Sequence, residues 1–391
     1  MAGRAVADRT GLLPVDDLPV LRQRRSAKWS RYPDDVLPLP VAEMDFALAP
    51  AVQDVLRRAV DASDTGYAHP EPVLGPALAR FAGERWGWDV DPGAVTGVPD
   101  VGVGAADLIR AACRPGDAVV IDPPVYPPFF TWVEEARTRL VEVPLRQRAD
   151  GAWRLDLEGL RAAFASRPAA YVLCNPHNPV GRVHDPAELA AVAAMAAEYG
   201  VTVIADEIHA PLVLPGAEFT PFLTVPGGAD VGISLMSASK AFNLAGLKCA
   251  AAVTASPAMR AVTDRLPSDG AWRIGHLGLL ATVAAFTDGG DWLDSLLATL
   301  DARRRQLSGL LAERLPQVHW VPSEATYLAW LDCRAIGDGD TPHELFLHEG
   351  RVALEPGTHF GAEGSGWVRL NYGTSEAILD EAVNRMAAAL R

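Results

Sequence analysis

Two side chains that follow apolar runs, Lys240 and Asp206, have the chemistry to act on a bound carbonyl compound. Lys240 comes shortly after the run 232–236, and lysine forms Schiff bases with carbonyl groups, the more readily when burial lowers its pKa. Asp206 directly follows the run 201–205, and a carboxylate beside a ring nitrogen favours the protonated form of that nitrogen. Pyridoxal phosphate needs both functions. Together with the hydroxyls and the aromatic ring described next, the pair suits a phosphorylated, heteroaromatic ligand that carries a carbonyl group.

Further polar side chains follow the same group of apolar runs. They supply an aromatic ring, amides, an imidazole and hydroxyls, and they are Tyr126, Asn175, Asn178, His209, Ser237 and Ser239. Open α/β sheets bind ligands at the carboxyl ends of their strands, so we expect these side chains to meet at one edge of a sheet. Each of them has an ordinary structural explanation when taken alone. Their convergence is what indicates a binding site.

The apolar runs themselves are typical of strands buried on both faces. They cover residues 118–121, 170–174, 201–205, 232–236 and 249–253. A helix between two of them is well marked, because Asp185 is a good N-cap, Pro186 takes the first helical position and Gly200 closes the end. Alternating strands and helices predict an α/β fold with a mostly parallel sheet between two helical layers.

The length of 391 residues favours two domains, because one hydrophobic core stops growing below this size. From about residue 283 the pattern changes to long helical stretches, followed by strand candidates at 326–331 and 367–371. We predict a large cofactor-binding domain over residues 46–282. The smaller α+β domain then combines residues 1–45 with residues 283–391.

Composition excludes several classes of partner. The chain has 35 basic and 49 acidic residues, and a net charge of −14 argues against a nucleic-acid partner or a polybasic membrane surface. No apolar stretch reaches the ~20 residues that span a bilayer. The four cysteines are far apart, which favours reduced thiols in a cytoplasmic protein over disulfides.

Two motifs suggest a dinucleotide site and a zinc site, but their residues do not have the spacing that these sites require. Gly102 and Gly104 could begin a dinucleotide fingerprint, but Asp107 stands where its third glycine is needed for close packing. His343 and His348 flank a glutamate as in a zinc helix, but they are five positions apart rather than four, which places them roughly 140° apart around a helix axis. They cannot share one metal ion, and we expect no metal.

Several longer motifs carry a resemblance to a known family. The segment SASKAFNLAGLK at 237–248 resembles the cofactor-lysine motif of fold-type I pyridoxal-phosphate enzymes, in the class I/II aminotransferase superfamily. NPHNPVG at 175–181 and ADEIH at 205–209 resemble two further motifs of these enzymes. The chain is most similar to their cystathionine β-lyase-like C–S lyase branch. The marks of that branch are KW at 28–29, LPLPVAEMDF at 37–46, GY at 66–67, PPVYPPF at 123–129, ATYLAWLD at 325–332 and VRLN at 368–371.

The resemblance implies a role for each residue that contacts the cofactor ring. Lys240 would carry the cofactor covalently and act as the catalytic residue. Asp206 would pair with the ring nitrogen, and Asn178 would bond the ring hydroxyl and contact the substrate. Tyr126 would stack on the ring, with His209 as a supporting group beside it.

The resemblance also implies how the phosphate and the substrate are held. The phosphate would contact Ser237, Ser239 and Lys248, and the backbone N–H groups of Val101 and Gly102 at a helix start. Tyr67 would reach the phosphate of the neighbouring subunit, which implies a homodimer. Arg369 would clamp the α-carboxylate of an amino-acid substrate in a bidentate pair that lysine could not reproduce.

The chain departs from the family pattern at a few positions. Pro40 replaces a tryptophan, Glu43 replaces an aspartate, and Asp100 stands where serine or glycine is usual. A helix that usually reads YLxxNR is TLDARR at 299–304. These changes concern the substrate pocket more than the cofactor site, and they favour a specialised substrate.

The resemblance predicts α,β-elimination from a cysteine S-conjugate such as cystathionine, which yields a thiol, pyruvate and ammonia. An aminotransferase would use the same residues and is the main alternative. A non-catalytic regulatory protein that keeps the fold is a third, which the intact set of Lys240, Asp206, Asn178 and Arg369 disfavours.

Overall fold

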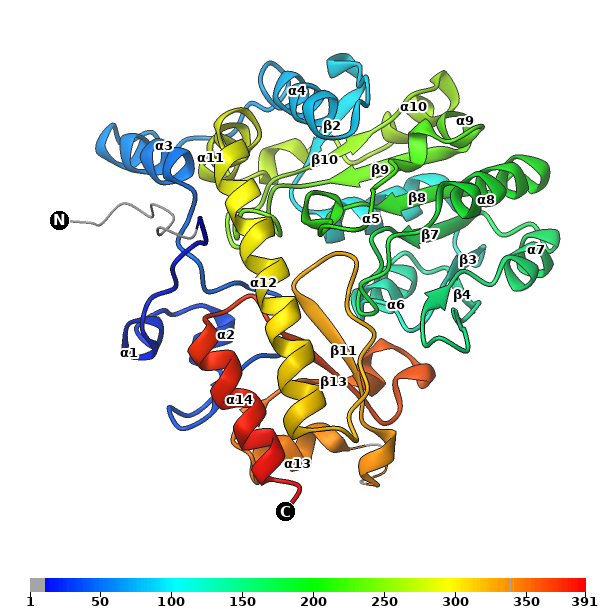
Figure 1. The fold of residues 1–391 in the computed structure, drawn as a ribbon. Coiled ribbons are helices and arrows are strands. Elements are labelled where there is room, and N and C mark those ends of the chain that lie inside the picture. The colour runs from blue at the N-terminus through cyan, green and yellow to red at the C-terminus, as the bar shows by residue number, and fades with distance from the viewer. Residues whose placement is uncertain (1–10, 338, 340) are drawn as a thin grey trace.

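The computed structural model describes residues 11–337, 339 and 341–391, and its centre is a seven-stranded sheet (Figure 1). The strand order is β2-β10-β9-β8-β7-β3-β4. The bounds of these strands are β2 Val95–Val98, β3 Ala118–Ile121, β4 Arg139–Glu142, β7 Ala170–Cys174, β8 Thr202–Asp206, β9 Gly232–Met236 and β10 Ala250–Val253. All neighbours from β9 to β4 are parallel, and β10 is antiparallel to both of its neighbours. The predicted mostly parallel sheet is confirmed.

The sheet lies between two helical layers, because successive side chains of a strand point to opposite faces. On β7, Tyr171 and Leu173 belong to one apolar core, and Val172 and Cys174 belong to the other. The first core is covered by α7 (Leu157–Ala165) and α8 (Pro186–Tyr199), and the second by α5 (Val101–Ala112), α6 (Pro128–Glu135) and α10 (Pro257–Thr263). The three-layer α/β arrangement is therefore confirmed.

Helix α8 shows how local sequence fixes an element. Asp185 and Glu188 form a capping box at its start, Pro186 takes the first position, and Gly200 ends it in the left-handed conformation at φ 75°. These are the predicted signals at the predicted positions.

A second group of elements joins the two ends of the chain (Figure 1). Strands β11 (Leu328–Asp332), β14 (Trp367–Asn371) and β13 (Glu355–Pro356) form an antiparallel sheet in that order. Near the N-terminus, β1 (Leu37–Pro38) pairs in parallel with β12 (Val352–Ala353). Segments more than 300 residues apart in sequence are thus side by side.

The remaining helices pack around these sheets. They are α1 Leu18–Leu21, α2 Ala27–Ser30, α3 Pro50–Asp61, α4 Leu74–Trp86, α9 Gly228–Val231, α11 His276–Asp288, α12 Gly290–Arg314, α13 Pro342–His348 and α14 Glu376–Ala388. A short hairpin pairs β5 (Arg146–Gln147) with β6 (Trp153–Arg154). Among the described residues, no helix is long and apolar enough to cross a membrane.

The division into domains 46–282 and 1–45 with 283–391 stays a prediction. Position 283 lies inside α11, which packs against α3, α4 and α12. Residues 1–10, 338 and 340 of the predicted smaller domain lie outside the described residues.

Candidate active site

A cavity of about 490 Å³ opens at the carboxyl edge of the parallel strands. That volume lies within the range of small-molecule and cofactor sites. Ten of the twelve predicted site residues line the cavity, namely Val101, Gly102, Tyr126, Asn178, Asp206, His209, Ser239, Lys240, Lys248 and Arg369. The predicted convergence of polar side chains at one sheet edge is therefore present.

Lys240 stands in the turn after β9, with part of its side chain open to the cavity. Its Nζ donates a hydrogen bond to the carbonyl of Ala42 at 3.2 Å. Burial and the nearby charge of Arg369 lower the pKa of Lys240 to about 8, although Asp206 acts in the opposite direction. A larger share of the amine is therefore neutral and nucleophilic at neutral pH than in an exposed lysine.

Asp206 ends β8 and is buried beside the same cavity. Its Oδ1 accepts a hydrogen bond from the backbone N–H of Ile208 at 3.1 Å. Burial raises the pKa of Asp206 to about 7, which a positively charged partner would lower again. A protonated ring nitrogen is such a partner, so the carboxyl suits the predicted role.

His209 is also buried, and burial together with the charges of Lys240 and Arg369 lowers its pKa to about 3. The imidazole is therefore neutral. Its Nδ1 is buried without a hydrogen-bond partner among the described residues. A neutral imidazole whose Nδ1 has no partner among the described residues suits the predicted role of His209 as a supporting group beside the cofactor ring.

One end of the cavity has the features of an anion site. The backbone N–H groups of Val101 and Gly102 begin the twelve-residue helix α5, where the helix dipole favours negative charge. Lys248 lies two residues before the start of β10. Because β10 runs against the parallel strands, its beginning lies at the edge where those strands end. Antiparallel pairing therefore brings Lys248 to the α5 terminus.

Asp100 also lies at this end and is the N-cap of α5. Its Oδ2 forms an ion pair with Lys248 Nζ at 2.8 Å, and its Oδ1 accepts from the N–H of Val103 at 2.7 Å. Burial acts to raise the pKa of Asp100, but the hydrogen bonds from Lys248 and Val103 outweigh it and lower the pKa. An ionised carboxylate therefore stands in the predicted phosphate site.

Arg369 lies on β14, is buried and also lines the cavity. Its Nη1 donates to Asn178 Oδ1 at 3.1 Å, and its Nη2 donates to the carbonyl of Pro40 at 2.8 Å. The guanidinium stacks over the ring of Phe360 at 4.9 Å. Its Nε has no partner among the described residues. A buried donor of this kind suits the oxygen of a ligand carboxylate.

The loop of residues 40–45 forms one wall of the cavity through Val41 and Ala42. Asn371 Nδ2 donates to the carbonyls of Val41 and Glu43 at 2.7 Å each. The hydroxyl of Tyr327 donates to the carbonyl of Ala42 at 2.9 Å, the same oxygen that Lys240 contacts. The loop is therefore held from the C-terminal sheet.

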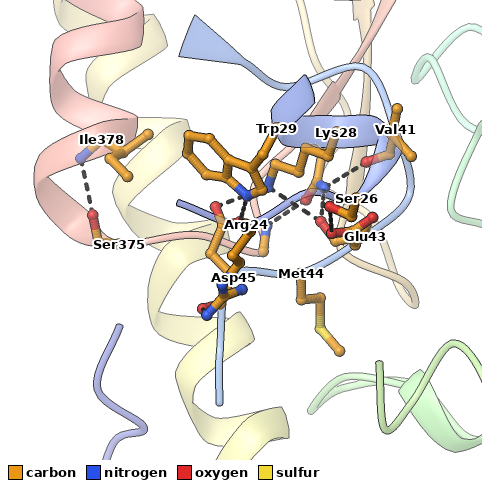
Figure 2. A network of polar contacts seen from close by, with 12 residues as sticks. Arg24, Ser26, Lys28, Trp29, Val41, Glu43, Met44, Asp45, Ser375 and Ile378 are labelled. Atoms are coloured by element: carbon orange, nitrogen blue, oxygen red, sulfur yellow. Dashed lines mark hydrogen bonds and ion pairs between the residues drawn. The ribbon is translucent and has the colours of Figure 1, made fainter. Parts of the chain in front are cut away.

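A buried ion pair holds the other side of the same loop (Figure 2). Lys28 and Asp45 are fully buried with their charges 2.8 Å apart, and Trp29 Nε1 donates to the second oxygen of Asp45 at 3.0 Å. Lys28 also donates to the carbonyl of Glu43 at 3.2 Å, and Ser26 contacts the Glu43 carboxylate. Lys28 and Trp29 are two of the residues that carry the family resemblance, and their contacts explain what they do.

Two of the twelve predicted residues do not line the cavity. The hydroxyl of Ser237 donates to the carbonyl of Cys249 at 2.7 Å and accepts from the N–H of Ser239 at 3.1 Å, so it ties the loop between β9 and β10. Tyr67 is 79% exposed and packs edge-to-face against Trp272, itself 62% exposed. A role for Tyr67 in a second subunit's site stays a prediction.

Sequence reasoning missed several residues that line the cavity. They include Trp132 on α6, Glu355 on β13, Phe360, and the backbone of Val41 and Ala42. Trp132 and Phe360 belong to the two apolar cores, and their sequence positions carry no signal that would set them apart from other core residues. Glu355 stands beside Pro356 in the sequence segment that forms β13, and a single glutamate at such a position matches no functional motif.

Comparison with known proteins agrees with this geometry. The family model of aminotransferase class I and II matches residues 34–386. This chain belongs to the aminotransferase class I and II family. It is 46% identical to a Mycobacterium leprae protein provisionally named cystathionine beta-lyase, over 96% of this chain and 98% of that protein. It is 35% identical to cystathionine beta-lyase PatB of Bacillus subtilis, over 94% and 97% of the two chains.

A solved structure of the family contains the predicted cofactor. Cystalysin from Treponema denticola, which contains pyridoxal 5′-phosphate, has a TM-score of 0.89 at 27% identity, over 94% of this chain and 95% of that one. The cavity described above fits this group, because it offers a lysine amine, a buried carboxylate and an anion site. The resemblance found in the sequence is confirmed, and pyridoxal phosphate is the cofactor of this enzyme family.

Proposed function

We propose that the protein is a pyridoxal-phosphate-dependent C–S β-lyase that cleaves a cysteine S-conjugate into a thiol, pyruvate and ammonia. One observation carries the proposal: the amine of Lys240, the carboxyl of Asp206 and the guanidinium of Arg369 line a single cavity. The names of the relatives, cystathionine beta-lyases, support the choice of reaction.

Bound pyridoxal phosphate would supply an electron sink for the negative charge that develops at the substrate Cα. In this proposal Asp206 holds a proton on the ring nitrogen, which maintains that sink. Lys248 and the α5 N-terminus hold the phosphate, and Tyr126 and His209 flank the ring.

The protein's own groups then control the Cα–H bond. Arg369 binds the α-carboxylate and fixes the orientation of the substrate. The lowered pKa of Lys240 makes its amine a suitable general base for the Cα proton. As that proton leaves, the Cβ–S bond breaks and the thiolate departs with its electron pair. The remaining enamine takes up water to give pyruvate and ammonia.

A homodimer and a cytoplasmic location are parts of the same proposal. The dimer rests on the exposed Tyr67 and on the family resemblance. The cytoplasmic location rests on the cysteines, which are all free among the described residues.

The test is to incubate purified holoenzyme with a panel of cysteine S-conjugates and ordinary amino acids, without added keto acid. We expect equal amounts of free thiol and pyruvate from at least one conjugate. Lys240→Ala should abolish both products, while an exposed control such as Arg80→Ala should retain them.

Product release that requires a keto acid would instead identify an aminotransferase. Thiol without pyruvate from every conjugate would contradict the elimination. Absence of turnover together with an unchanged absorption spectrum in Lys240→Ala would favour a non-catalytic protein.

A further inference from the structure

Glu355 is a carboxylate in the cavity that the proposed mechanism does not use. On the small sheet, Glu355 of β13 stands directly opposite Arg369 of β14. Directly opposed residues of an antiparallel pair project from the same face of a sheet. Glu355 and Arg369 therefore approach the cavity together, with opposite charges.

Arg369 interacts electrostatically with Glu355, but among the described residues the two form no ion pair. Arg369 makes its two hydrogen bonds to Asn178 and to Pro40, and the ion pair of Glu355 among the described residues is with His359. His359 Nδ1 lies 2.9 Å from Glu355 Oε1, but the histidine side chain is 56% exposed, whereas that of Glu355 is 20% exposed. Glu355 thus keeps a sheltered position with capacity for another donor.

The other groups around Glu355 do not remove its charge. Tyr32, Tyr126 and His343 are close enough to interact with it electrostatically, and none of them brings a permanent positive charge. A ligand that fills this part of the cavity therefore meets one carboxylate with unused acceptor positions. Burying that carboxylate against an apolar or anionic group would be costly.

The substrate's other charged groups already have places. Under the proposed function, on which this inference rests, the α-carboxylate binds Arg369 and the α-amino group reaches Lys240. The group left to face Glu355 is the far end of the leaving thiol. We propose that Glu355 binds a protonated amino group on that thiol, so that the enzyme prefers cysteine S-conjugates with a cationic leaving group.

Three matched substrates test this preference. S-aminoethyl-, S-hydroxyethyl- and S-carboxymethyl-L-cysteine carry a positive, a neutral and a negative leaving group of similar size. The variant Glu355→Gln keeps the shape of the side chain and removes its charge. Comparing each substrate between the natural enzyme and the variant cancels differences in the intrinsic reactivity of the three thiols.

We expect Glu355→Gln to lower kcat/KM for the aminoethyl conjugate about tenfold, the loss that follows when a charge-assisted bond becomes a neutral one. The hydroxyethyl conjugate should change less than about threefold, and the carboxymethyl conjugate should improve. The control His359→Ala, which leaves the carboxylate in place, should keep the preference for the aminoethyl conjugate.

The outcomes separate this inference from the proposed function. Equal loss on all three substrates, or loss of the preference in His359→Ala, would assign Glu355 a structural role and overturn the inference. Cleavage of the hydroxyethyl conjugate by the natural enzyme with no charge preference would also overturn it while leaving the lyase function intact. If the natural enzyme released pyruvate from none of the three substrates, that result would count against the proposed function itself.

Discussion

Asp100 is the residue that most changes the electrostatics of the predicted cofactor site. It places a carboxylate 2.8 Å from the lysine that is predicted to hold the phosphate. A phosphate at the α5 N-terminus would compete with this carboxylate for Lys248 and be repelled by its charge.

We predict that Asp100→Ser binds pyridoxal phosphate about tenfold more tightly, because serine can still cap the helix but carries no charge. The measurement is a titration of the cofactor-free protein, followed by absorbance. Asp107→Ser, which makes the same change of net charge on the same helix outside the cavity, should leave the affinity unchanged. Weaker binding by Asp100→Ser would show that the ion pair with Lys248 organises the site instead.

Lys240 gives a prediction on pH. Only the neutral amine attacks an aldehyde, and the pKa of Lys240 is lowered to about 8. The rate of covalent cofactor attachment to the cofactor-free protein should therefore rise with pH and level off above about 8, well below the range of an ordinary lysine. Stopped-flow absorbance measures this rate. A rate still rising near pH 10 would contradict the lowered pKa.

At the residue scale, the sequence predicted the groups that follow strands and missed those that reach the cavity from elsewhere. Asp206 and Lys240 follow apolar runs, so their common edge could be inferred from the strands alone. Glu355 and Phe360 reach the same cavity from the small sheet and the segment after it. Their approach depends on how that sheet packs against the large one, and no local pattern records such packing.

Elements with local signals were predicted well, and their ends less well. The helix at 186–199 is confirmed because its cap, proline and glycine are all local. The strand expected at 201–205 is shifted by one residue, to Thr202–Asp206, because Asp206 pairs with Cys174 and Leu235 on its two sides. The strand expected at 249–253 begins one residue later, at Ala250. Cys249 lies outside β10, and its carbonyl accepts a hydrogen bond from the hydroxyl of Ser237.

The loop of residues 40–45 depends on a buried ion pair, which yields a prediction on stability. Lys28→Met would leave the charge of Asp45 buried without its cation. We expect the free energy of unfolding of the holoenzyme to fall by about 3–5 kcal/mol, measured by urea denaturation. The double variant Lys28→Met with Asp45→Asn should recover part of this loss, since asparagine still accepts from Trp29.

The exposed pair of Arg80 and Glu84 provides the comparison. Arg80→Met should leave unfolding nearly unchanged, because exposed ion pairs contribute little. If Lys28→Met lowered the free energy of unfolding no more than Arg80→Met does, the ion pair of Lys28 and Asp45 would not stabilise the loop.

For the whole molecule, the predicted homodimer can be tested by complementation. If Tyr67 serves the partner's site, a Tyr67→Ala subunit and a Lys240→Ala subunit would together form one intact site. Each variant alone should be nearly inactive, and co-expressed subunits should recover about a quarter of normal activity in a symmetric dimer that assembles at random. Activity no higher than that of Tyr67→Ala alone would show that Tyr67 does not serve the partner's site.

The contacts between the two ends of the chain have a consequence for biosynthesis. Residues 37–43, which include most of the loop beside the cavity, are held by Val352, Arg369 and Asn371, more than 300 residues later in the sequence. Before those residues have been synthesised, the polypeptide already contains Lys240 and Asp206, but the segment that forms one wall of their cavity lacks these partners. The pocket can close only after residues 352–371 have been synthesised.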